Sequence, residues 1–109
     1  MICNSWSVVV VPFPFSERPG TKRRPALVLS KKPFNEKGHT VLAMITTKGH
    51  DAWAGDVWIR EVAATGLHQT CLVRLKMFTL DNRLILKQIG QMAEPDRKRV
   101  GTSLRRYLI

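Results

Sequence analysis

The sequence predicts a mainly β protein: a small, strongly bent antiparallel sheet or barrel, with one helix at the C-terminal end. Short apolar runs rich in β-branched residues recur along most of the chain, and polar stretches with glycine or proline separate them. Only the C-terminal stretch places its apolar residues at helical spacing. The length of 109 residues suits one domain, residues 1–109, with one modest core.

The first strand is expected at residues 8–11, where four consecutive valines favour a largely buried strand because β-branched side chains are stiff at χ1. Pro12 and Pro14 cannot donate to a ladder, so this end of the strand should lie at a sheet edge or leave the sheet. A second strand is expected at residues 26–29. The polar segment between them, residues 16–24, is predicted to be a loop that presents Arg24 from a rigid support.

The rest of the chain predicts further short strands before the helix. They are expected at residues 40–46, 57–59 and 71–74, with 77–80 extending or following the last after a kink, and two pieces within 84–92. Residues 31–38 read as a polar connection and 63–69 as a turn region around Gly66. Pro95 suits the first helical position, and Asp96 favours the positive end of that helix. One apolar stripe then follows at Val100, Leu104, Tyr107 and Leu108.

Charge composition indicates a polyanionic partner. The chain has 18 Lys and Arg against 8 Asp and Glu, a formal net charge of +10. Such an excess suits nucleic acid, an anionic membrane surface or an acidic protein, and the alternative is a set of merely solvated charged faces. Cys3 and Cys71 lie far apart, and Cys71 is expected to be a small buried hydrophobe rather than half of a disulfide. With no long apolar run or leader pattern, the protein is expected to be cytoplasmic, without a membrane partner.

The residues that carry chemistry narrow the choice of reaction. The sequence has no Gly-rich phosphate loop, no Cys/His cluster at metal-ligand spacing and no nucleophile elbow. His39, His50 and His68 stand apart from cysteines and carboxylate clusters, so neither a metal site nor a cofactor is expected. Basic residues and hydroxyls remain, and they suit phosphodiester cleavage in which the RNA supplies its own 2′-OH as the nucleophile.

The stretch PFPF, followed by a short polar loop and KRRPALVLS, resembles the start of the PemK/MazF-like toxins, the ribonuclease halves of bacterial toxin–antitoxin pairs. The Arg24-Pro25 dipeptide opening an apolar strand is the most specific part, and the likeness extends over roughly the whole chain. It implies an SH3-like barrel and a sequence-selective, metal-independent endoribonuclease. This enzyme would cleave single-stranded RNA to a 2′,3′-cyclic phosphate and a 5′-hydroxyl. The resemblance also implies a homodimer and an acidic antitoxin that competes for the basic groove.

The resemblance and the residue chemistry together give three candidate catalytic residues. Arg24 offers a planar fork of donors that matches two phosphate oxygens, and Pro25 fixes its backbone as extended. The alternative for Arg24 is a solvated loop arginine. Thr46 closes a strand as a matching threonine does in the family, and its alternative is a hydroxyl that caps a turn. Arg74 follows Leu72-Val73, where family members often have Val-Val-Arg.

The chain also departs from the family pattern. Lys76 stands where the family often has an acidic residue two positions after the arginine, which removes a possible general acid or base. His50 is a substitute, or else an ordinary loop histidine. Trp6-Ser7 replaces a usual Gly-Asp before the first strand and is expected to alter a turn.

A second group of residues is expected to bind RNA. Thr21 lies where family members often have a serine that positions the phosphate, and Trp53 either stacks on an unpaired base or covers the core. The full set is Thr21, Lys22, Arg23, Thr47, Trp53 and Lys76. Two alternatives to an active ribonuclease stay open. One is a catalytically inactive relative. The other is a gyrase-poisoning or nucleic-acid-binding protein of the same fold, although such toxins end in Trp-Gly-Ile and this chain ends in Tyr-Leu-Ile.

Overall fold

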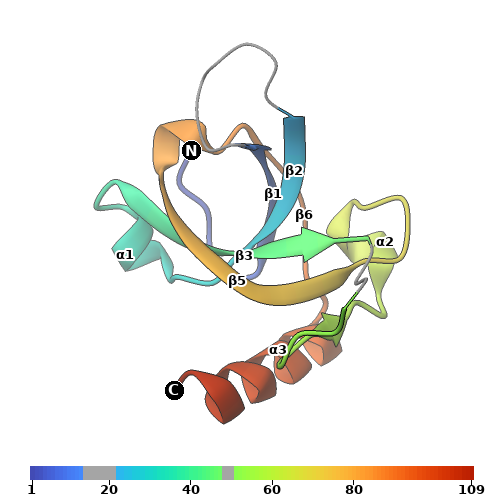
Figure 1. Cartoon of the computed structure of the whole chain (residues 1–109). Helices are drawn as coiled ribbons and strands as arrows, with labels where there is room; N and C mark the ends of the chain where they lie inside the picture. Colours follow the sequence, from blue (N-terminus) through green and yellow to red (C-terminus); the bar gives the residue numbers. More distant parts are fainter. Residues whose placement is uncertain (14–21, 48–50) are drawn as a thin grey trace.

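A curled antiparallel sheet of six strands forms the body of the protein (Figure 1). The computed structural model describes residues 1–13, 22–47 and 51–109. The sheet order is β4-β5-β3-β2-β1-β6. The strands are β1 (Ser7–Phe13), β2 (Lys22–Val28), β3 (His39–Thr46), β4 (Val57–Trp58), β5 (Leu72–Asp81) and β6 (Lys87–Gln91). The predicted class, a mainly β chain with a bent antiparallel sheet and a C-terminal helix, is confirmed.

Helices close the ends of the sheet and fill its connections. They are α1 (Lys32–Asn35), α2 (Val62–Thr65), the 3-10 turn η1 (Asn82–Leu84) and α3 (Glu94–Tyr107). In Figure 1 the long helix α3 lies beneath one end of the sheet, next to β4. Within the described part of the chain, no helix has the length and apolarity needed to cross a membrane.

Alternation along β1 supplies two cores, one on each face of the sheet. Val8 belongs to the cluster that also holds Leu27, Ile45 and Val100, whereas Val9 belongs to the cluster with Ala26 and Leu42. Six of these seven side chains have no solvent exposure, and the seventh, Ile45, is 3% exposed. Because both faces are covered, the near-continuous apolar runs of the sequence are explained. Cys3 and Cys71 are free and buried within these clusters, as expected for Cys71.

The end of β1 lies at a local sheet edge, as Pro12 predicts, while Pro14 lies outside the described residues. Strand β6 pairs with β1 only as far as Val10↔Lys87, while β2 continues to pair through Pro12 and Phe13. The described ladder on the β6 side therefore stops before Pro12, where a missing N–H costs nothing.

Strand β5 is longer than predicted because a bulge joins its two pieces. Ala43 pairs with Met77, but the next residue, Met44, pairs with Arg74. Leu75 and Lys76 are thus extra residues on β5, and the expected kink between two segments is a bulge within one strand.

One other local prediction was wrong, whereas the predicted C-terminal helix is present as α3. Residues 31–38 contain the short helix α1, whose Asn35 is fully buried and donates to the Cys3 carbonyl at 2.8 Å. The helical apolar stripe is only partly buried: Val100 is inaccessible, but Tyr107 is 46% exposed. Helix α1 forms because the buried Cys3 carbonyl of the N-terminal segment needs a hydrogen-bond donor, which Asn35 supplies. Tyr107 is exposed because α3 extends past the end of the sheet.

The turn before β1 keeps the geometry that glycine usually provides. Trp6 has a φ of 71°, the left-handed region that a residue with a Cβ rarely adopts. Its N–H donates to the Val28 carbonyl and its carbonyl accepts from the Met92 N–H, both at 2.8 Å. The indole also packs against the core. These contacts hold the backbone of Trp6 in the left-handed region, at the position where the family usually has glycine.

Candidate RNA-cleavage site at a splayed strand pair

Strands β2 and β3 separate at the point where Arg24 and Thr46 face each other. Their ladder runs from Val28↔Leu42 to Ala26↔Met44 and ends there. Continuing the same register places Arg24 opposite Thr46, where no pairing is formed. On its other side Arg24 still pairs with Val11 of β1. The backbone of Arg24 is therefore held by one neighbour, while its other side opens into space.

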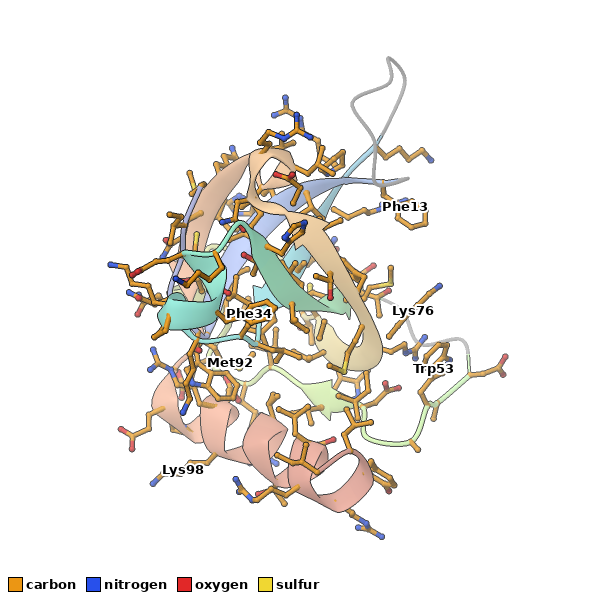
Figure 2. All side chains as sticks on the ribbon, turned by 90° about the vertical axis from the view of Figure 1, so that its left-hand side faces the viewer. Phe13, Phe34, Trp53, Lys76, Met92 and Lys98 are labelled. Atoms are coloured by element: carbon orange, nitrogen blue, oxygen red, sulfur yellow. The ribbon has the colours of Figure 1, made fainter. Side chains whose placement is uncertain are left out.

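The opening is a pocket of about 450 Å³. We call it the Arg24–Thr46 pocket. Its lining includes Phe13, Arg24, Met44, Thr46, Thr47 and Lys76. Figure 2 shows Phe13 and Lys76 on the same side of the molecule, extending from β1 and β5. The volume is in the range of small-molecule and nucleotide sites.

Arg24 lies in a strand and not in the predicted loop. Strand β2 begins at Lys22, and Lys22, Arg23 and Arg24 pair with Phe13, Pro12 and Val11. The basic run joins the ladder because β1 is long enough to offer it partners. Since side chains alternate along a strand, Arg23 and Arg24 point to opposite faces of the sheet. A strand fixes the direction of a guanidinium better than a loop would.

Arg74 lies apart from this pocket in a partly buried ion pair. Its Nε and Nη2 donate to the two carboxylate oxygens of Asp56 at 3.1 and 2.9 Å, and Nη2 also donates to the Asp51 carbonyl at 3.1 Å. Both side chains of the pair are 12% exposed. The hydrogen bond that Arg74 donates to Asp56 outweighs the effect of burial and raises the pKa of Arg74. Its guanidinium is a permanent cation in a bidentate pair.

Asp56 was not identified from the sequence. Burial alone raises its pKa, but hydrogen bonds from Arg74 and the Trp53 N–H, together with the charge of Arg74, outweigh burial and lower the pKa below 3.8. It is therefore a carboxylate at neutral pH and a poor proton donor. The only signal in the sequence was its place after Gly55, in a turn before a strand.

Trp53 is held by the same pair. The Arg74 guanidinium carbon lies 5.1 Å from the centroid of the Trp53 ring, a cation–π distance. The side chain is 43% exposed, so it does not cover the core. Figure 2 shows it on the side of the molecule that carries Lys76. One aromatic surface is thus presented to solvent and positioned by Arg74.

The structure groups the sequence-predicted residues in two places. Arg24, Thr46, Thr47 and Lys76 share the Arg24–Thr46 pocket, and Arg74 with Trp53 forms the neighbouring pair. Lys22 and Arg23 are exposed on β2. Thr21 and His50 lie outside the described residues. Among the residues described, no three His, Cys, Asp or Glu side chains could together hold a metal ion.

Comparison with known proteins agrees with this fold. The family model of the PemK-like, MazF-like toxin of type II toxin-antitoxin systems matches residues 4–108. No curated protein sequence matches the chain. A similar structure is an endoribonuclease in complex with its cognate antitoxin from a mycobacterial species, with a TM-score of 0.77 and 18% identity over 97% of this chain and 94% of that one.

Two further structures have the same architecture. The toxin MazF-mt6 of Mycobacterium tuberculosis gives a TM-score of 0.73 and 19% identity, over 92% of this chain and 93% of that chain. MazE–MazF of Deinococcus radiodurans gives 0.74 and 19%, over 96% and 95%. At such identities these structures show the fold, and the family match covers nearly the whole sequence. The chain therefore belongs to the PemK-like, MazF-like toxins of type II toxin–antitoxin systems.

Proposed function

We propose that the protein is a sequence-selective, metal-independent endoribonuclease toxin that cleaves single-stranded RNA. The observation that supports this most is the splay of β2 from β3, which places Arg24 and Thr46 across a pocket from one another. A guanidinium and a hydroxyl that line one pocket suit a phosphodiester, because the arginine fork binds two non-bridging oxygens and the hydroxyl donates or accepts one further hydrogen bond.

In the proposed reaction the RNA 2′-oxygen forms a bond to the adjacent phosphorus and the bond from phosphorus to the 5′-oxygen breaks. The 2′-OH loses its proton and the 5′-oxygen gains one, which leaves a 2′,3′-cyclic phosphate and a 5′-hydroxyl. Arg24 stabilises charge that grows on the phosphoryl oxygens, and Thr46 orients the phosphate. Lys76 adds a second cation. The described pocket residues include no carboxylate or imidazole, so we assign the proton transfers to solvent.

The RNA path extends from the pocket along the basic and aromatic surface. Lys22, Arg23 and Thr47 lie beside Arg24, and Trp53 offers a ring face on which an unpaired base stacks. Base–aromatic stacking contributes about 1–3 kcal/mol for each base. Arg74 holds Trp53 in position. A direct catalytic contact by Arg74 requires its guanidinium to exchange Asp56 for a phosphate, and that role stays a prediction.

A second candidate function is a nucleic-acid binder of the same fold without cleavage. Two observations favour it: Lys76 occupies the position where the family often has an acid, and Arg74 is engaged by Asp56. Both functions need the same basic surface, so only a test of cleavage separates them.

We also propose a homodimer and an acidic antitoxin as partners. The formal charge of +10 suits a tail in which carboxylates take the place of phosphates at Arg24 and its neighbours. Such a tail and RNA should exclude each other. Competition between an antitoxin tail and a 2′-O-methyl RNA for the purified protein tests this, and simultaneous binding without loss of affinity contradicts a shared surface.

The test of the function is cleavage of a long RNA in EDTA. The wild-type protein should cut it, and the 5′ fragments should carry cyclic phosphates. Arg24→Ala should lower the rate by about 10²–10³-fold, the usual effect of removing one donor to a developing oxyanion. Arg105→Ala, an exposed arginine on α3, is the matched control and should cleave normally. A wild-type protein that binds RNA but leaves it intact supports the non-catalytic binder instead.

A further inference from the structure

The splay of β2 and β3 opens a second pocket on the other face of the sheet. It has a volume of about 480 Å³ and shares Arg24, Pro25 and Thr47 with the Arg24–Thr46 pocket. We call it the Lys87 pocket. Its other walls come from Val10 of β1, from β6 and from the segment between α2 and β5, and none of these residues lines the Arg24–Thr46 pocket.

Strand register builds the floor of the Lys87 pocket. Val10 of β1 pairs with Pro25 of β2 on one side and with Lys87 of β6 on the other. Residues directly opposite in antiparallel strands share a face, so these three side chains form a row. Alternation along β2 then puts Arg23 on this face as well. The floor is apolar at Val10 and Pro25, with Lys87 at one end of the row and Arg23 two residues from Pro25 along β2.

Two glycines allow the wall formed by the segment after α2 to pack closely against β6. Gly66 has a φ of 76°, and a Cβ there would come within 2.1 Å of the Ile89 carbonyl oxygen. A Cβ on Gly90 would come within 2.5 Å of the Ala64 carbonyl oxygen. The Thr65 hydroxyl also accepts from the Leu67 N–H at 3.2 Å. The segment after α2 is therefore in backbone contact with β6, and the wall is formed before any ligand binds.

This wall carries two polar side chains that can form hydrogen bonds with a ligand. His68 and Gln69 line the pocket and are exposed. An amide presents a donor and an acceptor together, which matches the edge of a nucleobase. None of the described lining residues is acidic, whereas Arg23, Arg24 and Lys87 are cations. These features fit one nucleotide. The apolar floor would contact the face of the base, Gln69 would hydrogen-bond to the edge of the base, and the cations at the rim would bind the phosphate.

We propose that the Lys87 pocket binds the nucleotide next to the scissile phosphate and that Gln69 selects its base. This inference rests on the proposed function, because Arg24 would then hold the phosphate between the two pockets. The RNA chain would cross the sheet at the splay, with one nucleotide on each face. Selectivity for sequence would come from the wall after α2, and cleavage from the opposite face.

The test compares Gln69→Ala and Lys87→Ala with wild type and with Lys98→Ala, a control on α3 whose side chain is 76% exposed. Cleavage sites on a long RNA are mapped in EDTA, and KM and kcat are measured on one cleaved oligonucleotide. Gln69→Ala should relax the preference at one position beside the cut by about tenfold. Lys87→Ala should raise KM severalfold with kcat unchanged, because a phosphate contact outside the reacting centre gives uniform binding.

A binding assay separates failure of this inference from failure of the proposed function. With a 2′-O-methyl RNA, Lys87→Ala should weaken affinity and lower the log–log salt slope by about 0.7, one phosphate contact. If wild type does not cleave but this binding loss persists, the pocket assignment stands and the ribonuclease function fails. If both variants match Lys98→Ala in cleavage pattern, KM and RNA binding, the inference is wrong. Loss of binding to a poly-glutamate peptide alone would also overturn it, in favour of an acidic protein.

Discussion

Replacing Asp56 by alanine should destabilise the protein more than its place near the surface suggests. The substitution removes three charge-assisted bonds: those from Arg74 at 3.1 and 2.9 Å and that from the Trp53 N–H at 2.9 Å. Exposed ion pairs contribute at most about 1 kcal/mol, and breaking a fully buried pair costs about 3–5 kcal/mol. At 12% exposure of each side chain the loss should lie between them, at about 2 kcal/mol. For a domain of this size that corresponds to a fall in Tm of about 10 °C.

The pH dependence of the difference in Tm identifies the Arg74–Asp56 ion pair as the cause of the lost stability. Because the folded-state pKa of Asp56 is lowered below 3.8, its contribution is fully present above that pH and is lost as pH falls through the folded pKa. The gap in Tm between wild type and Asp56→Asn, followed by circular dichroism, should be constant near neutral pH and shrink below about pH 4. Asp51→Ala is the matched control, since the Asp51 carbonyl accepts the hydrogen bond and the Asp51 carboxylate acts on Arg74 only by its charge, the weakest of the contributions. A gap that does not change with pH, or one equal to that of the control, refutes the argument.

Three further outcomes are expected. Thr46→Val should reduce RNA cleavage at least about tenfold while Thr46→Ser retains it, because in the proposed reaction the hydroxyl and not the methyl group contacts the phosphate; equal rates would remove Thr46 from the site. Trp53→Ala should weaken binding of a 2′-O-methyl RNA by about 5–150-fold, the loss of one stacked base, whereas Trp58→Ala should not. Gly66→Ala should lower the free energy of unfolding in urea by roughly 2 kcal/mol or more, because its Cβ meets the Ile89 carbonyl at 2.1 Å; an unchanged midpoint would contradict the close approach.

The sequence predicted the strands well where local pattern and tertiary pairing agree. The valines of β1 and the apolar residues of β3 lie in strands whose bounds, Ser7–Phe13 and His39–Thr46, contain the predicted segments. The start of β2 was missed because Lys22, Arg23 and Arg24 have weak intrinsic strand preference and become ordered only by pairing with β1. Such pairing is non-local and leaves no trace in a short window of sequence.

The candidate site was predicted in part. Arg24 and Thr46 do share a pocket, since the register that ends at Ala26↔Met44 brings them opposite each other. The partner of Arg74 was not predictable, because Asp56 is distant in sequence and reaches it through the pairing of β4 with β5. The Lys87 pocket was equally hidden, since its walls come from five separate segments of the chain.

The bulge in β5 sets which changes of chain length this strand tolerates. Leu75 and Lys76 are two extra residues, an even number, so Arg74 and residues beyond Met77 keep the same alternation of faces on both sides of the bulge. If both were lost, all the remaining β5 side chains would still face the same side of the sheet as they do now. The Arg24–Thr46 pocket would lose only the Lys76 ammonium. If only one were lost, the side chains on one side of the deletion would move to the opposite face of the sheet. Relatives of this chain should therefore differ in β5 by two residues at a time, and the lysine can be gained or lost without rebuilding the sheet.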